Sequence, residues 1–394
     1  MLEKMKIAFL LGSLNRGGTE TLLLDVFRNA SAASLEMIGI HRKGGAYQEE
    51  FYATGRTMIQ CAPKRLGWIR YLLRLRQILQ SEKIDVVHAQ QPLDCIYARL
   101  ATIVTGIRVI ETFHSYDIGL GRYHKLIRAL SIRMADAVCF VSKAQRDYYK
   151  KACHIRNSEK LHVVYNGIDF AKFDKGYPEP EFLAGEPKAN ANASQETVRL
   201  VMVGNFVRGR SQMEVLKALS IVKGVECKVY GVQGVNSEEV RGKSFDFYFV
   251  GGKRASEAWR YDECVRYCEE HGLNDCVHFV GGRGDVPAIL QHIDGFVFAT
   301  EHDTFGIAVV EAMANGLPVV VNDWDVMREI THDGEWATLY KTGDSEDCAR
   351  ALQKLIEHID DEKQKAKENA AKVRGEYSIE RHIQSLAAVY RAES

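Results

Sequence analysis

Two carboxylates, Asp303 and Glu311, frame the start of an expected helix and are spaced to bind one ligand. Their segment, 296–323, reads FVFATEHDTFGIAVVEAMANGLPVVVND: an apolar strand, a polar turn, a helix-forming run and a second apolar strand. A helix N-terminus binds anions through its unpaired N–H groups, and Gly306 lets a ligand approach the backbone closely. The pattern predicts a pocket with an anion at the helix end and sugar hydroxyls on the carboxylates. The alternative is that Asp303 only caps the helix and Glu311 is solvated.

Polar residues and glycines also follow predicted strands in the first half of the chain. The strand 6–11 ends in a glycine-rich turn that contains Gly17, Gly18 and Glu20. Nucleotide-binding folds place a phosphate at such a turn, although an ordinary tight turn is the alternative. The strand 109–114 ends in His114, which is either a ligand-binding residue facing a cleft or a satisfied structural histidine.

The first predicted strand of the second half of the chain covers residues 198–204. The loop that follows this strand is cationic and contains Asn205, Arg208 and Arg210. A diphosphate carries at least two negative charges, so its binding requires more than one cation. Arg208 and Arg210 meet that requirement. A further loop that contains Arg283 leads into the expected helix 287–293.

These motifs together resemble the retaining glycosyltransferases of family 4, which have the GT-B fold. The family writes its main motif as E-x-F-G-x-x-x-x-E-A-M-A-x-G-x-P-V-V. Asp303 replaces the first glutamate of that motif, Asn205 replaces the arginine of its G-R-L-x-x-x-K-G loop, and Arg210 stands at the lysine of that loop. The main motif is otherwise matched at Phe305, Gly306, Glu311, Ala312, Met313, Ala314, Gly316, Pro318, Val319 and Val320.

The resemblance implies a role for each candidate residue. Glu311 would bind the ribose hydroxyls, Asp303 the transferred sugar, and His114 would position that sugar from the opposite domain. The diphosphate would lie against Gly17, Gly18, Asn205, Arg208, Arg210 and Gly306, with Glu20 on the acceptor side and Arg283 near the base. The implied donor is UDP- or GDP-linked, and no metal or other cofactor is implied.

The implied architecture is α/β, with two doubly wound Rossmann-like domains facing each other across a cleft. We expect an N-terminal acceptor domain at 1–175, a linker at 176–197 and a C-terminal donor domain at 198–377. The helix 378–394 would pack back onto the first domain. Other expected elements are helix 143–152 capped by Ser142, an Asn166–Gly167 turn with positive φ, strand 228–231, and helices 255–271, 345–375 and 379–391.

Composition and charge narrow the class of protein further. The chain has 394 residues and no net charge, but 27 Lys+Arg against 17 Asp+Glu in residues 1–180 give that half +10 and leave −10 for the rest. The basic amphipathic helices expected at 64–80 and 122–134 indicate an anionic membrane surface or a saccharide or lipid-linked acceptor. The alternative is a core-facing helix with a solvated basic rim. Nothing indicates nucleic acid.

Cysteine usage and hydropathy indicate a cytoplasmic protein, and the basic helices add the expectation of a peripheral contact with the inner membrane face. The nine cysteines lack a disulfide-like spacing, and no export signal or run of about 18 apolar residues is present. Cys264, Cys268 and His271 have the spacing of metal ligands on a helix, but we expect them to pack as small apolar groups.

Two other functions fit the same motifs. A sugar-nucleotide 2-epimerase of GT-B fold would turn over the donor with no acceptor present. An inactive sugar-nucleotide-binding protein, suggested by Asn205 and Asp303, would bind nucleotide without releasing nucleoside diphosphate. We expect a glycosyltransferase that moves a sugar from a nucleotide donor to an acceptor hydroxyl with retention, in polysaccharide or glycolipid synthesis.

Overall fold

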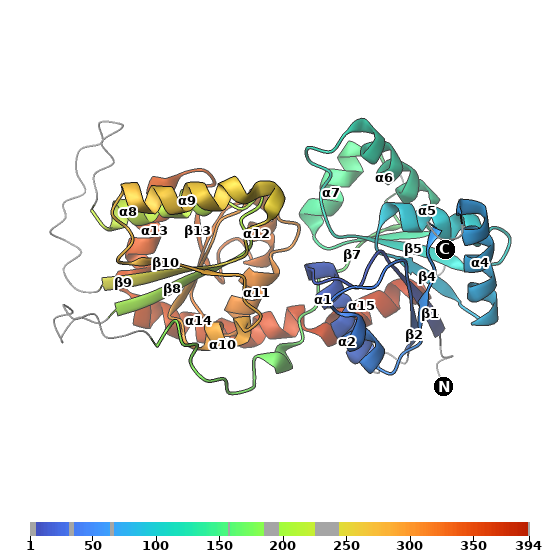
Figure 1. Ribbon diagram of the computed structural model, residues 1–394, viewed down its shortest axis with the longest axis horizontal. Coiled ribbons are helices and arrows are strands. Elements are labelled where there is room, and N and C mark those ends of the chain that lie inside the picture. The colour runs from blue at the N-terminus through green and yellow to red at the C-terminus, as the bar shows by residue number, and fades with distance from the viewer. Residues whose placement is uncertain are drawn as a thin grey trace. The chain divides into compact units, whose positions relative to one another are not determined.

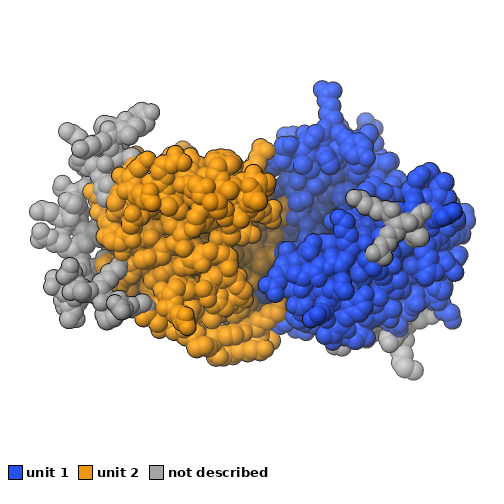
Figure 2. All heavy atoms as spheres, viewed as in Figure 1, with its two compact units in different colours: residues 1–169, 377–394 blue, residues 170–376 orange. Residues whose placement is uncertain are grey.

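The computed structural model describes residues 5–30, 35–63, 67–156, 158–184, 197–224 and 244–392. It divides into two compact units: unit 1 comprises residues 1–169 and 377–394, and unit 2 comprises residues 170–376 (Figure 2). Each unit is built on its own parallel β-sheet. The expected strand 228–231, Arg65 and most of the expected linker lie outside the described residues.

The sheet of unit 1 has the strand order β3-β2-β1-β4-β5-β6-β7, with every neighbouring pair parallel. Its central strands are buried along most of their length, as expected for a parallel sheet covered on both faces. The strands are β1 (Met5–Leu11), β2 (Leu35–His41), β3 (Met58–Gln60), β4 (Val86–Ala89), β5 (Arg108–Phe113), β6 (Ala137–Phe140) and β7 (Leu161–Val163).

Two apolar cores pack on the two faces of this sheet (Figure 1). The first core contains residues of α1, α2 and α15, and the second contains residues of α4, α5, α6 and α7. The helices are α1 (Gly18–Arg28), α2 (Gln48–Ala53), α4 (Trp68–Ser81), α5 (Pro92–Ala101), α6 (Arg122–Met134), α7 (Lys143–Ala152) and α15 (Ile379–Arg391).

The strand order of unit 1 reverses between β1 and β4. From β1 the chain proceeds to β2 and β3 on one side, and from β4 to β5, β6 and β7 on the other. The connections therefore diverge at the carboxyl ends of β1 and β4, and open α/β sheets bind ligands at such a crevice.

Unit 2 repeats this arrangement with the strand order β10-β9-β8-β11-β12-β13, and its order reverses between β8 and β11. The strands are β8 (Thr197–Val203), β9 (Ser244–Val250), β10 (Val277–Gly281), β11 (Gly295–Phe298), β12 (Val319–Asn322) and β13 (Thr338–Tyr340). The helices are α8 (Gln212–Val222), α9 (Ala258–Glu270), α10 (Val286–Gln291), α11 (Ile307–Ala314), α12 (Asp325–Ile330), α13 (Ser345–Glu357) and α14 (Ile359–Tyr377), with 3-10 turns at Phe170–Lys172 and Ala255–Glu257.

Several local expectations are confirmed. Helix 143–152 is α7, and the Ser142 hydroxyl accepts a hydrogen bond from the Gln145 N–H at 3.1 Å, as a capping serine should. The last helix has the expected bounds. The helix-forming run of segment 296–323 is α11, which ends at Ala314 with Asn315 as its C-cap; Gly316 follows with a φ of 71°, the left-handed conformation typical of a helix end.

Two expectations are wrong. The helix expected at 345–375 is two helices, α13 and α14, which separate at His358. Asp360, Asp361 and Glu362 lie in the first turn of α14, where the helix dipole favours acidic residues. The signal for a new helix start was therefore present in the sequence.

The second wrong expectation concerns Gly167, which does not adopt a positive φ. Glycine is required there because of packing. A Cβ at this position would lie 2.5 Å from the Cβ of His382 and 2.8 Å from the Cα of Ile379. Gly167 therefore allows α15 to pack closely against the chain that follows β7.

Candidate functional site

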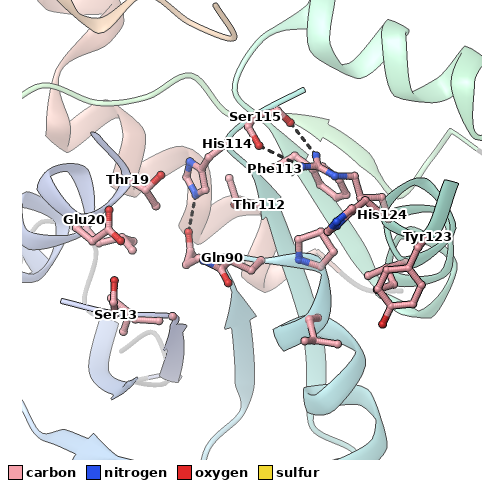
Figure 3. Close-up of a pocket in the computed structure, with 18 residues that line it drawn as sticks. Ser13, Thr19, Glu20, Gln90, Thr112, Phe113, His114, Ser115, Tyr123 and His124 are labelled. Atoms are coloured by element: carbon pink, nitrogen blue, oxygen red, sulfur yellow. Dashed lines mark hydrogen bonds between the residues drawn. The ribbon is translucent and has the colours of Figure 1, made fainter. Parts of the chain in front are cut away.

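A cavity of about 470 Å³ lies at the carboxyl ends of β1, β4 and β5 in unit 1, where the strand order reverses (Figure 3). Glu20 and Ser13 line one side of it, Tyr123 and His124 line the other, and His114 lies between them. Most of the polar groups that face this cavity are hydroxyls, amides and imidazoles, which suit a ligand rich in hydroxyl groups.

His114 follows β5 and is held by Gln90, the residue that follows β4. The His114 Nε2 donates a hydrogen bond to the Gln90 Oε1 at 2.8 Å, since that amide oxygen can only accept. Desolvation lowers the pKa of His114 well below its usual range, with a smaller contribution from His382. The imidazole is therefore neutral at physiological pH and acts as a hydrogen-bonding group.

A buried hydrogen-bonded chain supports the floor of the same cavity. His88 in β4 bridges the Tyr390 hydroxyl of α15, at 2.6 Å from Nδ1, and the Thr112 hydroxyl of β5, at 2.7 Å from Nε2. Thr112 lines the cavity. Burial lowers the pKa of His88 to about 3, so this link stays uncharged. The C-terminal helix is thus connected to the cavity through one neutral histidine.

A second support holds Gln91, another residue of the cavity wall. The Arg42 guanidinium donates a hydrogen bond to the Gln91 Oε1 at 2.6 Å, and its Nε lies 3.3 Å from the Asp94 Oδ1. Desolvation raises the pKa of the buried Asp94 to about 6, while Arg42 opposes that shift. Gly12 leaves room for this group, because a Cβ there would lie 2.8 Å from the Gln91 amide nitrogen.

The glycine-rich turn places its residues at the start of α1. Gly17 is the N-cap in extended conformation, and Gly18 is the first helical residue. The Glu20 carboxylate folds back over Gly17, since a Cβ on Gly17 would lie 2.6 Å from the Glu20 Oε2. Thr19 and Glu20 line the cavity. A carboxylate at a helix N-terminus is favoured by the helix dipole.

In unit 2, Asp303 and Arg210 form an ion pair between the loops that follow β11 and β8. The Arg210 guanidinium lies 2.7 Å from the Asp303 Oδ2, and the Asp303 Oδ1 accepts hydrogen bonds from the Phe305 and Gly306 N–H groups at 3.1 and 3.0 Å. Asp303 therefore binds both a cation and the backbone of the turn that precedes α11. It does not cap the helix, because the N-cap of α11 is Gly306 and the helix has no side-chain cap hydrogen bond.

Two further contacts fix the Arg210 side chain. It lies 4.8 Å from the centre of the Phe298 ring, and it donates a hydrogen bond to the Thr300 hydroxyl at 3.1 Å. The Thr300 hydroxyl in turn donates to the Gly209 carbonyl at 2.7 Å, and Asn322 binds the Thr300 backbone through its amide group. Arg210 is therefore a preorganised cation at the carboxyl edge of the sheet.

Asn205 and Arg208, the other two candidate residues of the cationic loop, do not take part in the Arg210–Asp303 ion pair. Asn205 joins two loops, because its Oδ1 accepts a hydrogen bond from the Gly252 N–H at 2.8 Å. Arg208 is exposed, and its backbone N–H donates to Glu257 at 2.6 Å. Both arginines line a second cavity, of about 520 Å³, together with Lys217 and Arg260.

Arg283 and Glu311 are the remaining sequence-predicted site residues of unit 2. The exposed Arg283 forms a two-pronged ion pair with Asp285, at 2.7 and 2.6 Å, and lies 4.8 Å from the centre of the Phe182 ring. This ion pair raises the pKa of Arg283 and lowers that of Asp285. Glu311 lies partly exposed in α11, five residues after its N-cap Gly306.

We expect Gly306→Ala to destabilise the protein by roughly 2–3 kcal/mol, because two costs add. Gly306 has a φ of 83°, and a Cβ there would lie 2.7 Å from the Met327 Cε. Gly272→Ala is the matched control, since its φ is 62° and nothing lies within 4 Å of its Cβ position. Urea denaturation should show the smaller loss for Gly272→Ala. Equal losses would mean that the Met327 contact costs nothing.

Sequence reasoning missed Gln90, Thr112, Phe298 and Thr300. Each lies at or just after the carboxyl end of a buried strand, a position that the sequence could have signalled. The tertiary partners that give them importance are not visible in sequence. No group of three or more His, Cys, Asp or Glu side chains that could hold a metal ion exists within the described ranges, and Cys264 and Cys268 are buried.

Comparison with known proteins extends these observations. The chain matches the family model Glycosyltransferase Family 4 over residues 16–172 and the model Glycosyl transferases group 1 over residues 186–373. It is 34% identical over 290 residues to the phosphatidyl-myo-inositol mannosyltransferase of Mycobacterium leprae, which covers 72% of this chain and 67% of that protein. It is 24% identical over 299 residues to the N,N'-diacetylbacillosaminyl-diphospho-undecaprenol alpha-1,3-N-acetylgalactosaminyltransferase of Campylobacter jejuni, covering 72% of this chain and 70% of that protein.

The fold is also that of solved structures, among them a glycosyltransferase from Rickettsia africae, which matches with a TM-score of 0.80 at 16% identity and covers 99% of this chain and 98% of that one. The crystal structure of Anabaena HepE in complex with UDP matches with a TM-score of 0.78 at 19% identity, covering 98% of this chain and 99% of that one. The expected fold class is thereby confirmed, since both sheets are parallel and doubly wound. The chain therefore belongs to the family-4 glycosyltransferases and has their GT-B fold.

Proposed function

We propose that this glycosyltransferase moves a sugar from a UDP- or GDP-linked donor to an acceptor hydroxyl with retention of anomeric configuration. The observation that carries the proposal is the Arg210–Asp303 pair beside the N-terminus of α11. A guanidinium and the positive end of a helix suit a diphosphate, and a carboxylate suits sugar hydroxyls. Support for the donor also comes from the HepE structure, whose ligand is UDP.

The roles of the residues follow from their chemistry. Arg210, with Arg208, the Asn205 loop and the N–H groups near Gly306, would stabilise the departing diphosphate without a metal. Gly17 and Gly18 would present backbone N–H groups to it. Asp303 and Glu311 would accept hydrogen bonds from the transferred sugar and the ribose. Arg283 would lie near the base. The departing diphosphate oxygen would assist deprotonation of the acceptor, with no covalent nucleophile.

We assign the cavity of unit 1 to the acceptor and the transferred sugar. Glu20 would bind acceptor hydroxyls, and the neutral His114, fixed by Gln90, would donate or accept hydrogen bonds with the transferred sugar. The relatives support a saccharide or lipid-linked acceptor, since the name of one includes a diphospho-undecaprenol and that of another phosphatidyl-myo-inositol. We place the protein in polysaccharide or glycolipid synthesis in the cytoplasm, with reversible binding to an anionic membrane.

None of the helices in the described residues is long and apolar enough to cross a membrane.

A thermal-shift screen of nucleotide sugars tests the donor. We expect a UDP- or GDP-sugar to raise the melting temperature by several degrees at millimolar concentration, because ligand binding to the folded state alone stabilises it. Incubation of the stabilising donor with and without candidate acceptors then separates the functions. Release of nucleoside diphosphate only with an acceptor supports transfer, whereas turnover of donor alone indicates an epimerase. Binding with no turnover under any condition indicates an inactive binding protein.

A further inference from the structure

The outward face of α6 is apolar and unpartnered. Of its thirteen residues only Ser131 and Ile132 are buried. Tyr123, Leu126 and Leu130 are 70%, 65% and 43% exposed and lie on one side of the helix, and we call these three residues the α6 strip. Single exposed leucines are common on protein surfaces. A row of exposed apolar side chains on a helix with only two buried residues instead indicates a surface that binds a membrane or another molecule.

A similar set lies on α4, which packs into the same core as α5 and α6. Trp68, Ile69 and Leu73 are 63%, 56% and 63% exposed, and we call them the α4 strip. Helices that follow parallel strands begin at the carboxyl edge of the sheet. Because α4 follows β3 and α6 follows β5, their N-terminal turns, which hold most of these residues, begin at the edge that carries the cavity.

The charges around the two strips are all positive. Neither helix contains an aspartate or glutamate, and the exposed cations are Arg70, Arg74, Arg122, Lys125 and Arg133. An apolar strip with an interfacial tryptophan and flanking arginines complements an anionic lipid surface, because the side chains enter the headgroup region while the cations meet lipid phosphates.

The α6 strip is continuous with the cavity wall. Tyr123 belongs to both, and His124, Ile127 and Arg128 line the cavity from the neighbouring face of the helix. In Figure 3, Tyr123 and His124 project from α6 on the side opposite Glu20. A ligand in the cavity can therefore reach the apolar strip without passing through the protein interior.

The cavity has a charge polarity that matches such a ligand. Glu20 lies at one end, and Arg128 lies at the α6 end. Arg128 is held in place, since its guanidinium donates hydrogen bonds to the Ser115 carbonyl at 2.9 Å, to the Ser115 hydroxyl at 3.2 Å and to the Tyr149 hydroxyl. A fixed cation between a hydroxyl-binding end and an apolar strip suits a phosphate placed between a sugar and a hydrocarbon chain.

We infer that the acceptor is a saccharide carried on a lipid phosphate or diphosphate, taken from an anionic bilayer that contacts the α6 and α4 strips. Its sugar lies toward Glu20, its phosphate lies at Arg128 and His124, and its hydrocarbon chain follows the α6 strip. This inference rests on the transferase function proposed above. It adds the chemical class of the acceptor and the surface through which that acceptor enters.

Co-sedimentation with vesicles tests the surface. Wild-type protein is expected to bind vesicles of phosphatidylglycerol and phosphatidylcholine at low salt, and Leu126→Gln/Leu130→Gln to weaken binding at least about tenfold. The matched control is Leu100→Gln/Ile103→Gln, because these residues are 39% and 50% exposed at the end of α5 far from its N-terminus, away from the cavity edge. The inference is overturned if Leu126→Gln/Leu130→Gln still binds vesicles, or if the control variant loses binding to the same extent. It is also overturned if the wild-type protein forms a dimer without lipid and only Leu126→Gln/Leu130→Gln is monomeric.

Calorimetry with farnesyl diphosphate tests the phosphate position, with inorganic diphosphate and farnesol as separate arms. We expect farnesyl diphosphate to bind more tightly than either part alone, and Arg128→Gln to weaken it roughly tenfold or more, with partial rescue in Arg128→Lys. Binding of inorganic diphosphate as tight as farnesyl diphosphate would show a site for free phosphate and contradict a lipid acceptor. If nucleotide sugars stabilise the protein but it binds neither vesicles nor farnesyl diphosphate, the inference about the acceptor is wrong while the proposed transferase function still stands.

Discussion

Replacing Arg210 by glutamine is expected to lower kcat/KM for sugar transfer by roughly 10²–10³-fold, as removal of a preorganised transition-state donor does in other enzymes. The structure fixes Arg210 through Asp303, Thr300 and the Phe298 ring. Charge develops on the diphosphate as its bond to the sugar breaks, so a fixed guanidinium there stabilises the transition state more than the bound donor. The fall should therefore appear mainly in kcat.

Arg210→Lys is the conservative partner of this variant, because lysine is the residue that the family motif has at this position. We expect it to keep activity within about tenfold of wild type, since it retains the charge and loses only the fork geometry. Melting temperatures of both variants check that loss of the Asp303 pair has not unfolded unit 2. If Arg210→Gln is as active as wild type, Arg210 does not take part in sugar transfer.

The family motif has an arginine where this chain has Asn205, and Arg208→Gln tests whether Arg208 supplies the missing positive charge. Arg208 is exposed and is not bonded to Asp303, but it lines the second cavity of unit 2 with Arg210. If it supplies the charge that Asn205 lacks, its loss should raise KM for the donor while kcat changes less, because an exposed cation with no fixed partner in the transition state binds ground and transition states similarly. No change in either constant would show that one arginine suffices.

The elements that carry the site were largely predictable from sequence. The strand, turn, helix and strand around Asp303 follow from apolar runs, Gly306 and the Asn315–Gly316 stop, and all lie where expected. These signals are local: hydrophobic period, glycine and proline act within a few residues. The helix break at His358 had a local signal as well, in the acidic residues after it.

The contacts that give the site its geometry were not predictable. Arg210 meets Asp303 across two loops that are 93 positions apart in the chain. His88 contacts Tyr390 at a separation of 302 positions. Gly167 looks like a turn residue in sequence, yet its role is set by α15. Such pairings depend on tertiary packing, which overrides local preference and leaves no pattern in one sequence.

Glu111 is a buried carboxyl group that no local pattern identified. It lies in β5 with no exposed surface. Desolvation raises the pKa of Glu111 from 4.5 to about 8, although Ser131 of α6 and Cys95 of α5 lower it in part. The group is therefore a neutral carboxylic acid at physiological pH.

Glu111→Gln is expected to become progressively more stable than wild type as the pH rises from about 5 to 8. Below pH 4.5 the carboxyl is protonated in both folded and unfolded chains, so the two proteins should differ little. Above that value the unfolded chain ionises while the folded one resists, and wild type loses about 1.4 kcal/mol per pH unit until its folded pKa is reached. The full difference is on the order of 5 kcal/mol from the two pKa values, 4.5 and about 8.

Urea denaturation at several pH values measures this difference, with the exposed Glu49→Gln in α2 as the control for loss of one negative charge. A difference that stays constant with pH would mean that Glu111 ionises freely in the folded protein. The result also bears on the cavity, because Ser131 lies in α6, which lines the cavity through His124 and Arg128. Arg128 also lowers the pKa of Glu111 in part, so ionisation of Glu111 would place a negative charge near a cation that lines the cavity. We therefore expect acceptor binding to weaken at alkaline pH in wild type before it does in Glu111→Gln.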